Sequence, residues 1–158
     1  MSIDPDELRR LSRAYADASA TREAQERVRQ AQREAQLKAV AQQDYHDRYE
    51  EAATKFRSSL PGTVEDRLRY SASQGSSGSS IEVGTFRTYS GRAEHDAGKQ
   101  VADEMAARIN QIPGMRARVN DEQSSEIKTE YGGMHGTTAT GRSTFKINKV
   151  TLRIERDS

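Results

Sequence analysis

The chain has 158 residues, of which 33% are hydrophobic and 31% are charged, and it contains no cysteine and no tryptophan. Without cysteine the chain can form no disulfide, no thiol nucleophile and no cysteine-ligated zinc site. The formal net charge of +1 gives no global attraction to nucleic acid or to an anionic membrane. A mean hydropathy of −0.96 is low for one globule of this length. We therefore expect part of the chain to lie outside a compact core or against another subunit.

The first residues lack a basic segment followed by an apolar stretch, so no signal peptide is predicted. No run in the sequence approaches the roughly 18 apolar residues of a membrane span. We expect no membrane partner, and either a cytoplasmic location or a place in a particle assembled inside the cell.

A long charged helix is predicted to begin at Pro5. Asp4 can cap it, and proline suits the first helical position. Ala, Arg, Gln and Glu, all strong helix formers, dominate the next fifty residues. Pro61 and the glycine after it are typical of a helix end. The predicted division is therefore a helical region, residues 1–62, and a second region, residues 63–158.

An apolar seam follows this helix in two heptad frames, which are offset by three residues between Ala18 and Val28. The pattern fits a two-stranded coiled coil with polar breaks, and it also fits a single helix that packs only at its ends. We predict that the seam contacts a second copy of the chain or another protein. The predicted interface residues are Leu8, Leu11, Tyr15, Val28, Tyr45, Tyr49 and Phe56.

The second region is predicted to be α+β, with the element order ββαβββ and two flexible Gly/Ser-rich hairpin loops. Alternating apolar residues predict five strands, which lie near residues 68–72, 81–88, 115–119, 127–131 and 145–154. Ala97, Val101, Met105 and Ile109 recur every four residues and predict an amphipathic helix over residues 93–111. Short connections favour antiparallel pairing. The predicted fold class is a long N-terminal helix followed by a small antiparallel sheet with one packed helix.

The three histidines offer little chemistry. His95 beside Asp96 could be a general base with a carboxylate partner, but neighbours on a helix point about 100° apart. His46 and Glu50 share a helix face but supply too few ligands for a metal. His135 lies in a glycine-rich segment that matches neither common phosphate-binding motif. We expect no catalytic residue, no metal and no cofactor.

Basic residues concentrate in the predicted strands, where they would form a positive face for phosphate backbones if the strands are neighbours. Glutamates in the same region and the balanced net charge weigh against this interpretation. The predicted nucleic-acid contacts are Arg116, Arg118, Lys146, Lys149 and Arg153.

The leading hypothesis is a non-enzymatic structural or assembly protein that acts through self-association or protein–protein contact, as a subunit of a larger particle such as a phage virion. The sparse core, the heptad-like seam and the lack of a catalytic constellation favour it. A long helix followed by a small sheet with flexible loops is common among small assembly proteins. The alternatives are a nucleic-acid-binding module and, third, a small enzyme that uses His95 or His135.

Overall fold

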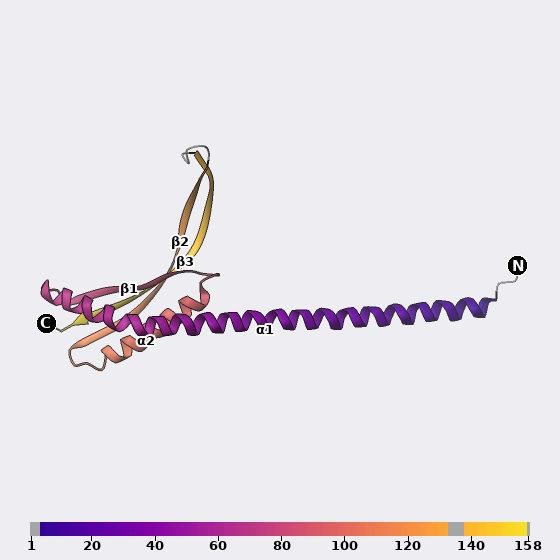
Figure 1. The fold of residues 1–158 in the computed structure, drawn as a ribbon, viewed down its shortest axis with the longest axis horizontal. Coiled ribbons are helices and arrows are strands. Elements are labelled where there is room, and N and C mark those ends of the chain that lie inside the picture. The colour runs from indigo at the N-terminus through magenta and orange to yellow at the C-terminus, as the bar shows by residue number, and fades with distance from the viewer. Residues whose placement is uncertain (1–3, 133–137, 158) are drawn as a thin grey trace. The chain divides into compact units, whose positions relative to one another are not determined.

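The computed structural model of the chain describes residues 4–132 and 138–157, and these residues form two helices and three strands (Figure 1). The elements in chain order are α1 (Pro5–Ser73), β1 (Gly78–Arg87), α2 (Arg92–Ile109), β2 (Met115–Gly132) and β3 (Thr138–Arg156). The chain divides into two compact units, Met1–Asp44 and Tyr45–Ser158. The α+β class, the long N-terminal helix and the antiparallel sheet with a second helix are as predicted.

The helix α1 begins at the predicted residue but continues past the predicted end. The carboxylate of Asp4 accepts a hydrogen bond of 2.9 Å from the backbone N–H of Asp6, which is the expected N-cap. Pro61 lies inside the helix, where a proline costs about 3 kcal/mol. Leu60 and Val64 on either side are only 4% and 5% exposed, and burying two such side chains contributes about 3–6 kcal/mol. Core packing therefore overrides the helix-breaking signal, and the predicted helix end near residue 60 is wrong.

The true end of α1 is a left-handed turn at Gly75, which has a φ of 70°. The N–H of Ser76 donates to the carbonyl of Ser71 at 3.0 Å, and the N–H of Gly75 donates to the carbonyl of Ala72 at 3.1 Å. Glycine adopts this conformation without a Cβ penalty. The strand predicted near Leu68 is thus the last part of α1, and the Ser/Gly-rich segment joins that helix to β1.

The sheet has the order β1-β3-β2, with both pairs antiparallel. Its three strands replace the four that were predicted after residue 80, because residues 115–119 and 127–131 both belong to the continuous strand β2. The register of β1 shifts between Glu82 and Gly84, which is the bulge that the glycine allows. No shift occurs on β3 between Ile147 and Val150, so this part of the strand is regular in both pairings.

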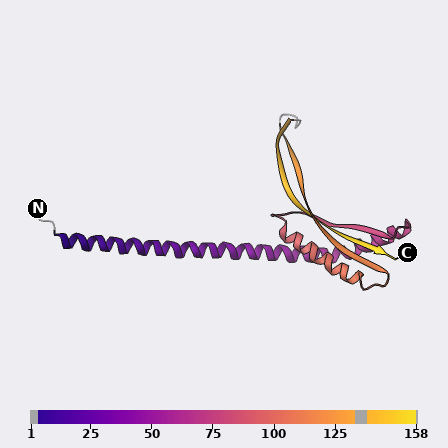
Figure 2. The same ribbon diagram turned by 180° about the vertical axis from the view of Figure 1, so that it is seen from behind.

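The hairpin of β2 and β3 extends beyond β1 as a two-stranded ribbon (Figure 2). β1 ends where Arg87 pairs with Ile147, whereas β2 and β3 continue to the pair Gly132 and Thr138. The three-stranded part of the sheet therefore covers only the inner half of this hairpin.

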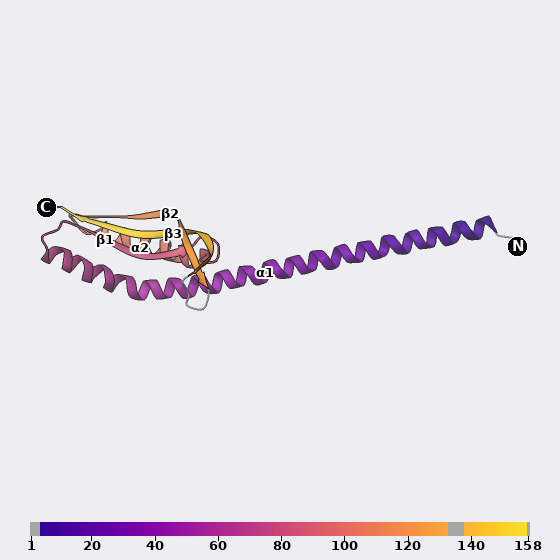
Figure 3. The ribbon, with the colours of Figure 1, turned by 90° about the horizontal axis from the view of Figure 1, so that it is seen from above.

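The core lies on one face of the three-stranded part of the sheet. Alternate β3 residues are buried there, because successive side chains of a strand point to opposite faces. Figure 3 shows the strands above the part of α1 that follows residue 45, and α2 contributes to the same core. The largest buried side chains are those of Val150, Leu152 and Ile154 on β3. Leu152 and Ile154 belong to one core cluster with Ala53, Leu60 and Val64 of α1 and with Ala97, Val101 and Ile109 of α2.

Candidate functional site

Large apolar side chains are exposed along the part of α1 that belongs to the first unit. Burying such side chains is the dominant source of stability in folding and association. A row of them on one helix is therefore a candidate surface for a partner. The exposed fractions lie between 55% and 77% for Leu8, Leu11, Tyr15, Val28, Leu37 and Val40.

Five of these six side chains share one side of the helix. Successive residues of an α-helix are about 100° apart, so Leu8, Leu11, Tyr15, Leu37 and Val40 fall within an arc of about 80°. With Ala18 the arc widens to about 100°, and from Leu11 onward its residues recur with an 11-residue period, which keeps a stripe nearly parallel to the helix axis. We call this set the N-terminal stripe: Leu8, Leu11, Tyr15, Ala18, Arg22, Glu26, Arg29, Arg33, Leu37 and Val40.

The N-terminal stripe differs from the predicted seam in two ways. Leu37 and Val40 were not among the predicted interface residues, although their spacing of 11 from Glu26 and Arg29 was visible in the sequence. Val28 lies about 140° from the centre of the stripe in a regular helix, so it belongs to another side of α1.

The later part of the predicted seam lies in the second unit and packs within its own chain. Tyr49 and Phe56 are half-buried against the core, and the ring of Phe56 meets that of Phe86 edge to face with centroids 6.0 Å apart. The hydroxyl of Tyr45 donates a hydrogen bond to Asp96 on α2. The rings of Tyr49 and Phe56 therefore already have partners within the chain.

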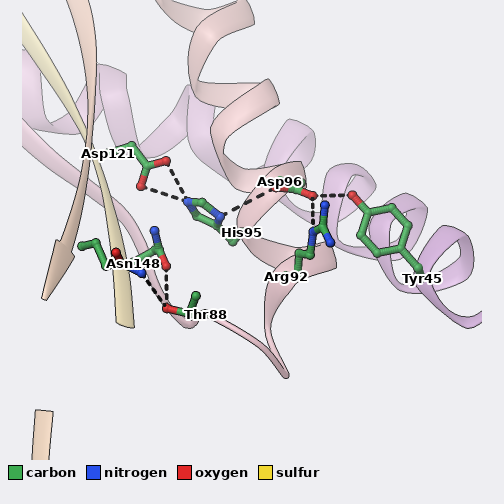
Figure 4. Close-up of polar contacts among 8 residues, drawn as sticks. Tyr45, Thr88, Arg92, His95, Asp96, Asp121 and Asn148 are labelled. Carbon is green, nitrogen blue, oxygen red and sulfur yellow. Dashed lines mark hydrogen bonds and ion pairs between the residues drawn. The ribbon is translucent and has the colours of Figure 1, made fainter. Parts of the chain in front are cut away.

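A row of polar groups lies at the start of α2 (Figure 4). The Nε2 atom of His95 is 2.9 Å from both carboxylate oxygens of Asp121 on β2, and its Nδ1 atom is 3.7 Å from Asp96. Arg92 and Tyr45 approach the same Asp96 carboxylate. The sequence indicated His95 with Asp96 but not Asp121, which is 26 positions away. The available signal was the alternation of β2, which continues the inward row of Ala117 and Val119 to position 121.

These polar side chains, Tyr45, Arg92, His95, Asp96 and Asp121, connect α2 to β2 and to α1. Nε2 of His95 is within hydrogen-bonding distance of the Asp121 carboxylate, whereas Nδ1 lies near Asp96 at a distance longer than a hydrogen bond. The side chain of His95 is 15% exposed, and its ring lies 5.9 Å from that of Phe86. The hydrogen bond to Asp96 raises the pKa of the Tyr45 phenol above its ordinary value. The arrangement fastens α2 to β2 on one side and to α1 on the other.

Two ion pairs also join α1 to α2 in the second unit. The guanidinium of Arg48 contacts both carboxylate oxygens of Glu94 at 2.8 and 2.9 Å. The guanidinium of Arg57 lies 3.0 Å from Glu104, and its hydrogen bonds hold the pKa of that carboxyl below its ordinary value. The α1 residues 45–73 are thereby tied to α2 by charge as well as by apolar packing.

The face of the sheet opposite the core carries four of the five predicted nucleic-acid contacts. Arg118 on β2 is directly paired with Arg153 on β3, and the alternation of the strands places Arg116 and Lys149 on the same face. Lys146 is three positions from Lys149 in an unbroken part of β3. Its side chain therefore points to the other face of the sheet and does not belong to this basic face.

Carboxylates partly neutralise the basic face. The Nζ atom of Lys149 is 3.1 Å from Glu82, and the guanidinium of Arg118 is 4.0 Å from Glu155. A hollow of about 430 Å³ lies between these side chains; its lining includes Lys149, Arg153 and Glu82. The face can bind a phosphate only where its cations outweigh these glutamates.

The other histidines add no site. His46 and Glu50 are both exposed on α1, and His135 lies outside the described residues. Within residues 4–132 and 138–157, no group of three or more histidines and carboxylates is placed to hold a metal ion. In the same part of the chain, no helix combines the length and the apolar character needed to cross a membrane.

Comparisons of the chain with protein-family models, with curated proteins and with solved structures found no match.

Proposed function

We propose that the chain is a non-enzymatic structural or assembly protein, a subunit of a larger particle, and that it acts through association of α1 with α1 of a second copy. The observation that carries the proposal is the row of exposed aliphatic and aromatic side chains on the N-terminal stripe. In water, such a helix gains most of its stability from packing an apolar side rather than from helix propensity. A partner helix supplies that packing.

The second unit supports a structural role. It has its own core, and the partly buried imidazole of His95 contacts the carboxylates of Asp121 and Asp96. We propose that these side chains position α2 on the sheet and take no part in a reaction. The unit would then act as the folded body that the associating helix brings into the assembly.

The test is the molar mass of the full chain in solution, measured by light scattering over a wide range of concentration. We expect a defined oligomer whose fraction rises with concentration, with little dependence on salt if apolar contacts dominate. A chain that remains a monomer at the highest concentration would exclude self-association.

A second candidate function, nucleic-acid binding, is favoured by the direct pairing of Arg118 with Arg153 on the outer face of the sheet. Lys149→Gln should then weaken binding to DNA or RNA and lower the dependence on salt by about one counterion. Lys146→Gln is the matched control, because that lysine leaves the other side of β3. No binding at low salt, or equal effects of both substitutions, would rule out this face.

A further inference from the structure

We propose that the N-terminal stripe pairs with the same stripe of a second copy in the antiparallel direction, with the two-fold axis at the level of Ala24. This inference rests on the proposed self-association and adds its direction and its register. It follows from the order of side chains along α1, where aliphatic groups occupy both ends of the stripe and ionic groups occupy the middle.

Antiparallel pairing about Ala24 brings the two apolar ends together. Leu8 of one copy faces Val40 of the other, and Leu11 faces Leu37, and the symmetry repeats both pairs. All four side chains are more than half exposed in the single chain, so each gains burial from this contact. Sliding one copy by one helical turn breaks both pairs and leaves at most one facing aliphatic pair, Leu8 with Leu37 or Leu11 with Val40.

The charges in the middle of the stripe favour the same register. Arg22 faces Glu26 of the second copy, and the symmetry makes this ion pair twice. Arg33 faces Tyr15, a cation and an aromatic ring that attract each other. Opposite charges at facing positions set the direction and register of paired helices.

In a parallel pair in register, like charges would face each other along the stripe. This arrangement places Arg22 against Arg22, Glu26 against Glu26 and Arg33 against Arg33, and like charges at facing positions are unfavourable. The leucines would still meet in that arrangement. The charges therefore decide the direction, while the leucines supply the contact.

The surface is tested on the full chain with two matched substitutions, Val40→Glu and Val28→Glu. Both introduce a glutamate at an exposed valine of α1, but only the first lies on the N-terminal stripe. We expect Val40→Glu to raise the dissociation constant by about a hundredfold or more, because each dimer loses two buried valines and gains two carboxylates in an apolar contact. We expect Val28→Glu to change it by less than about threefold. The reverse order would overturn the assignment of the stripe.

The direction is tested with Leu11→Lys, Leu37→Glu and the double variant. Each single substitution should weaken association. In the antiparallel dimer the new ammonium faces the new carboxylate, so the double variant should associate at least as tightly as Leu11→Lys. In a parallel dimer each new charge faces its own kind, and the two weakening factors would multiply. That result would overturn the antiparallel inference but leave self-association intact, whereas a wild-type chain that never associates would overturn both.

Discussion

Replacing Phe56 by alanine should destabilise the second unit without changing the association of two copies of the chain. The ring of Phe56 packs edge to face on Phe86, and it also reaches α2 at Gly98, where an added Cβ would lie 3.3 Å from it. Truncation of a fully buried phenylalanine costs about 3–5 kcal/mol. Because Phe56 is half-buried, we expect the lower end or less, about 2–3 kcal/mol, of which the edge-to-face pair contributes about 0.5–1.5 kcal/mol.

The assay is amide hydrogen exchange at Val150 and Leu152, whose buried position in β3 makes their exchange report the opening of the whole unit. A loss of about 2–3 kcal/mol corresponds to exchange about 30 to 150 times faster. Tyr15→Ala is the control; its side chain is 77% exposed, so it should change this exchange by less than about 0.5 kcal/mol. The reasoning is refuted if Phe56→Ala leaves exchange unchanged and lowers the molar mass instead, since the ring would then lie between two copies.

Three further perturbations test local contacts of the second unit. Because Arg57 holds the pKa of Glu104 below its ordinary value, the folded state binds fewer protons there than the unfolded state. Stability is therefore lost as the pH falls below the ordinary range of a glutamate carboxyl. Glu104→Gln should remove this part of the acid dependence in urea titrations, and an unchanged dependence would contradict the pairing. The pKa of Tyr45 is raised, so its contribution to stability is present below about pH 10 and is lost above it. Tyr45→Phe should flatten the alkaline end of the curve of stability against pH. A spectrophotometric titration without a late-titrating tyrosine would argue against the hydrogen bond. Gly75→Ala should lower the stability of the second unit by about 1 kcal/mol, because Gly75 has a positive φ. Gly62→Ala should raise it by up to about 1 kcal/mol, because Gly62 lies inside α1 and an added Cβ would meet open space. Effects of the same sign would contradict the assigned helix end.

The elements that depend on local chemistry could be predicted from the sequence. The cap at Asp4 determines where α1 starts. The four-residue spacing of Ala97, Val101, Met105 and Ile109 determines which side of α2 faces the core. Capping and helical periodicity involve neighbours within a few residues, so no tertiary contact is needed to recognise them.

The errors arose where distant packing overrides a local signal. Pro61 and Gly62 indicate a helix end, but the buried side of α1 continues through Leu60 and Val64 and carries the helix past them. Residues 120–126 resemble a polar loop in the sequence, yet they form strand because β3 supplies a paired residue opposite every position. Such compensation is visible only when the partner strand is known.

The partner of His95 was missed for the same reason. Asp121 reaches the imidazole through the register of the sheet, and register depends on pairing rather than on composition. The N-terminal stripe is a different case, because its 11-residue period is present in the sequence. A heptad frame divides it into two offset seams and places Val28 on the contact in place of Leu37 and Val40.

The most direct test of the proposed pairing is a distance between spin labels on the full chain carrying Ser12→Cys, since the natural chain has no cysteine. Position 12 of one copy lies level with position 36 of the other in the antiparallel dimer. At a rise of 1.5 Å per residue and an interaxial distance of about 8–10 Å, we predict a label separation of about 40 Å. A separation of about 15 Å would show parallel helices, and no dipolar coupling at high concentration would show that the chain does not pair through α1.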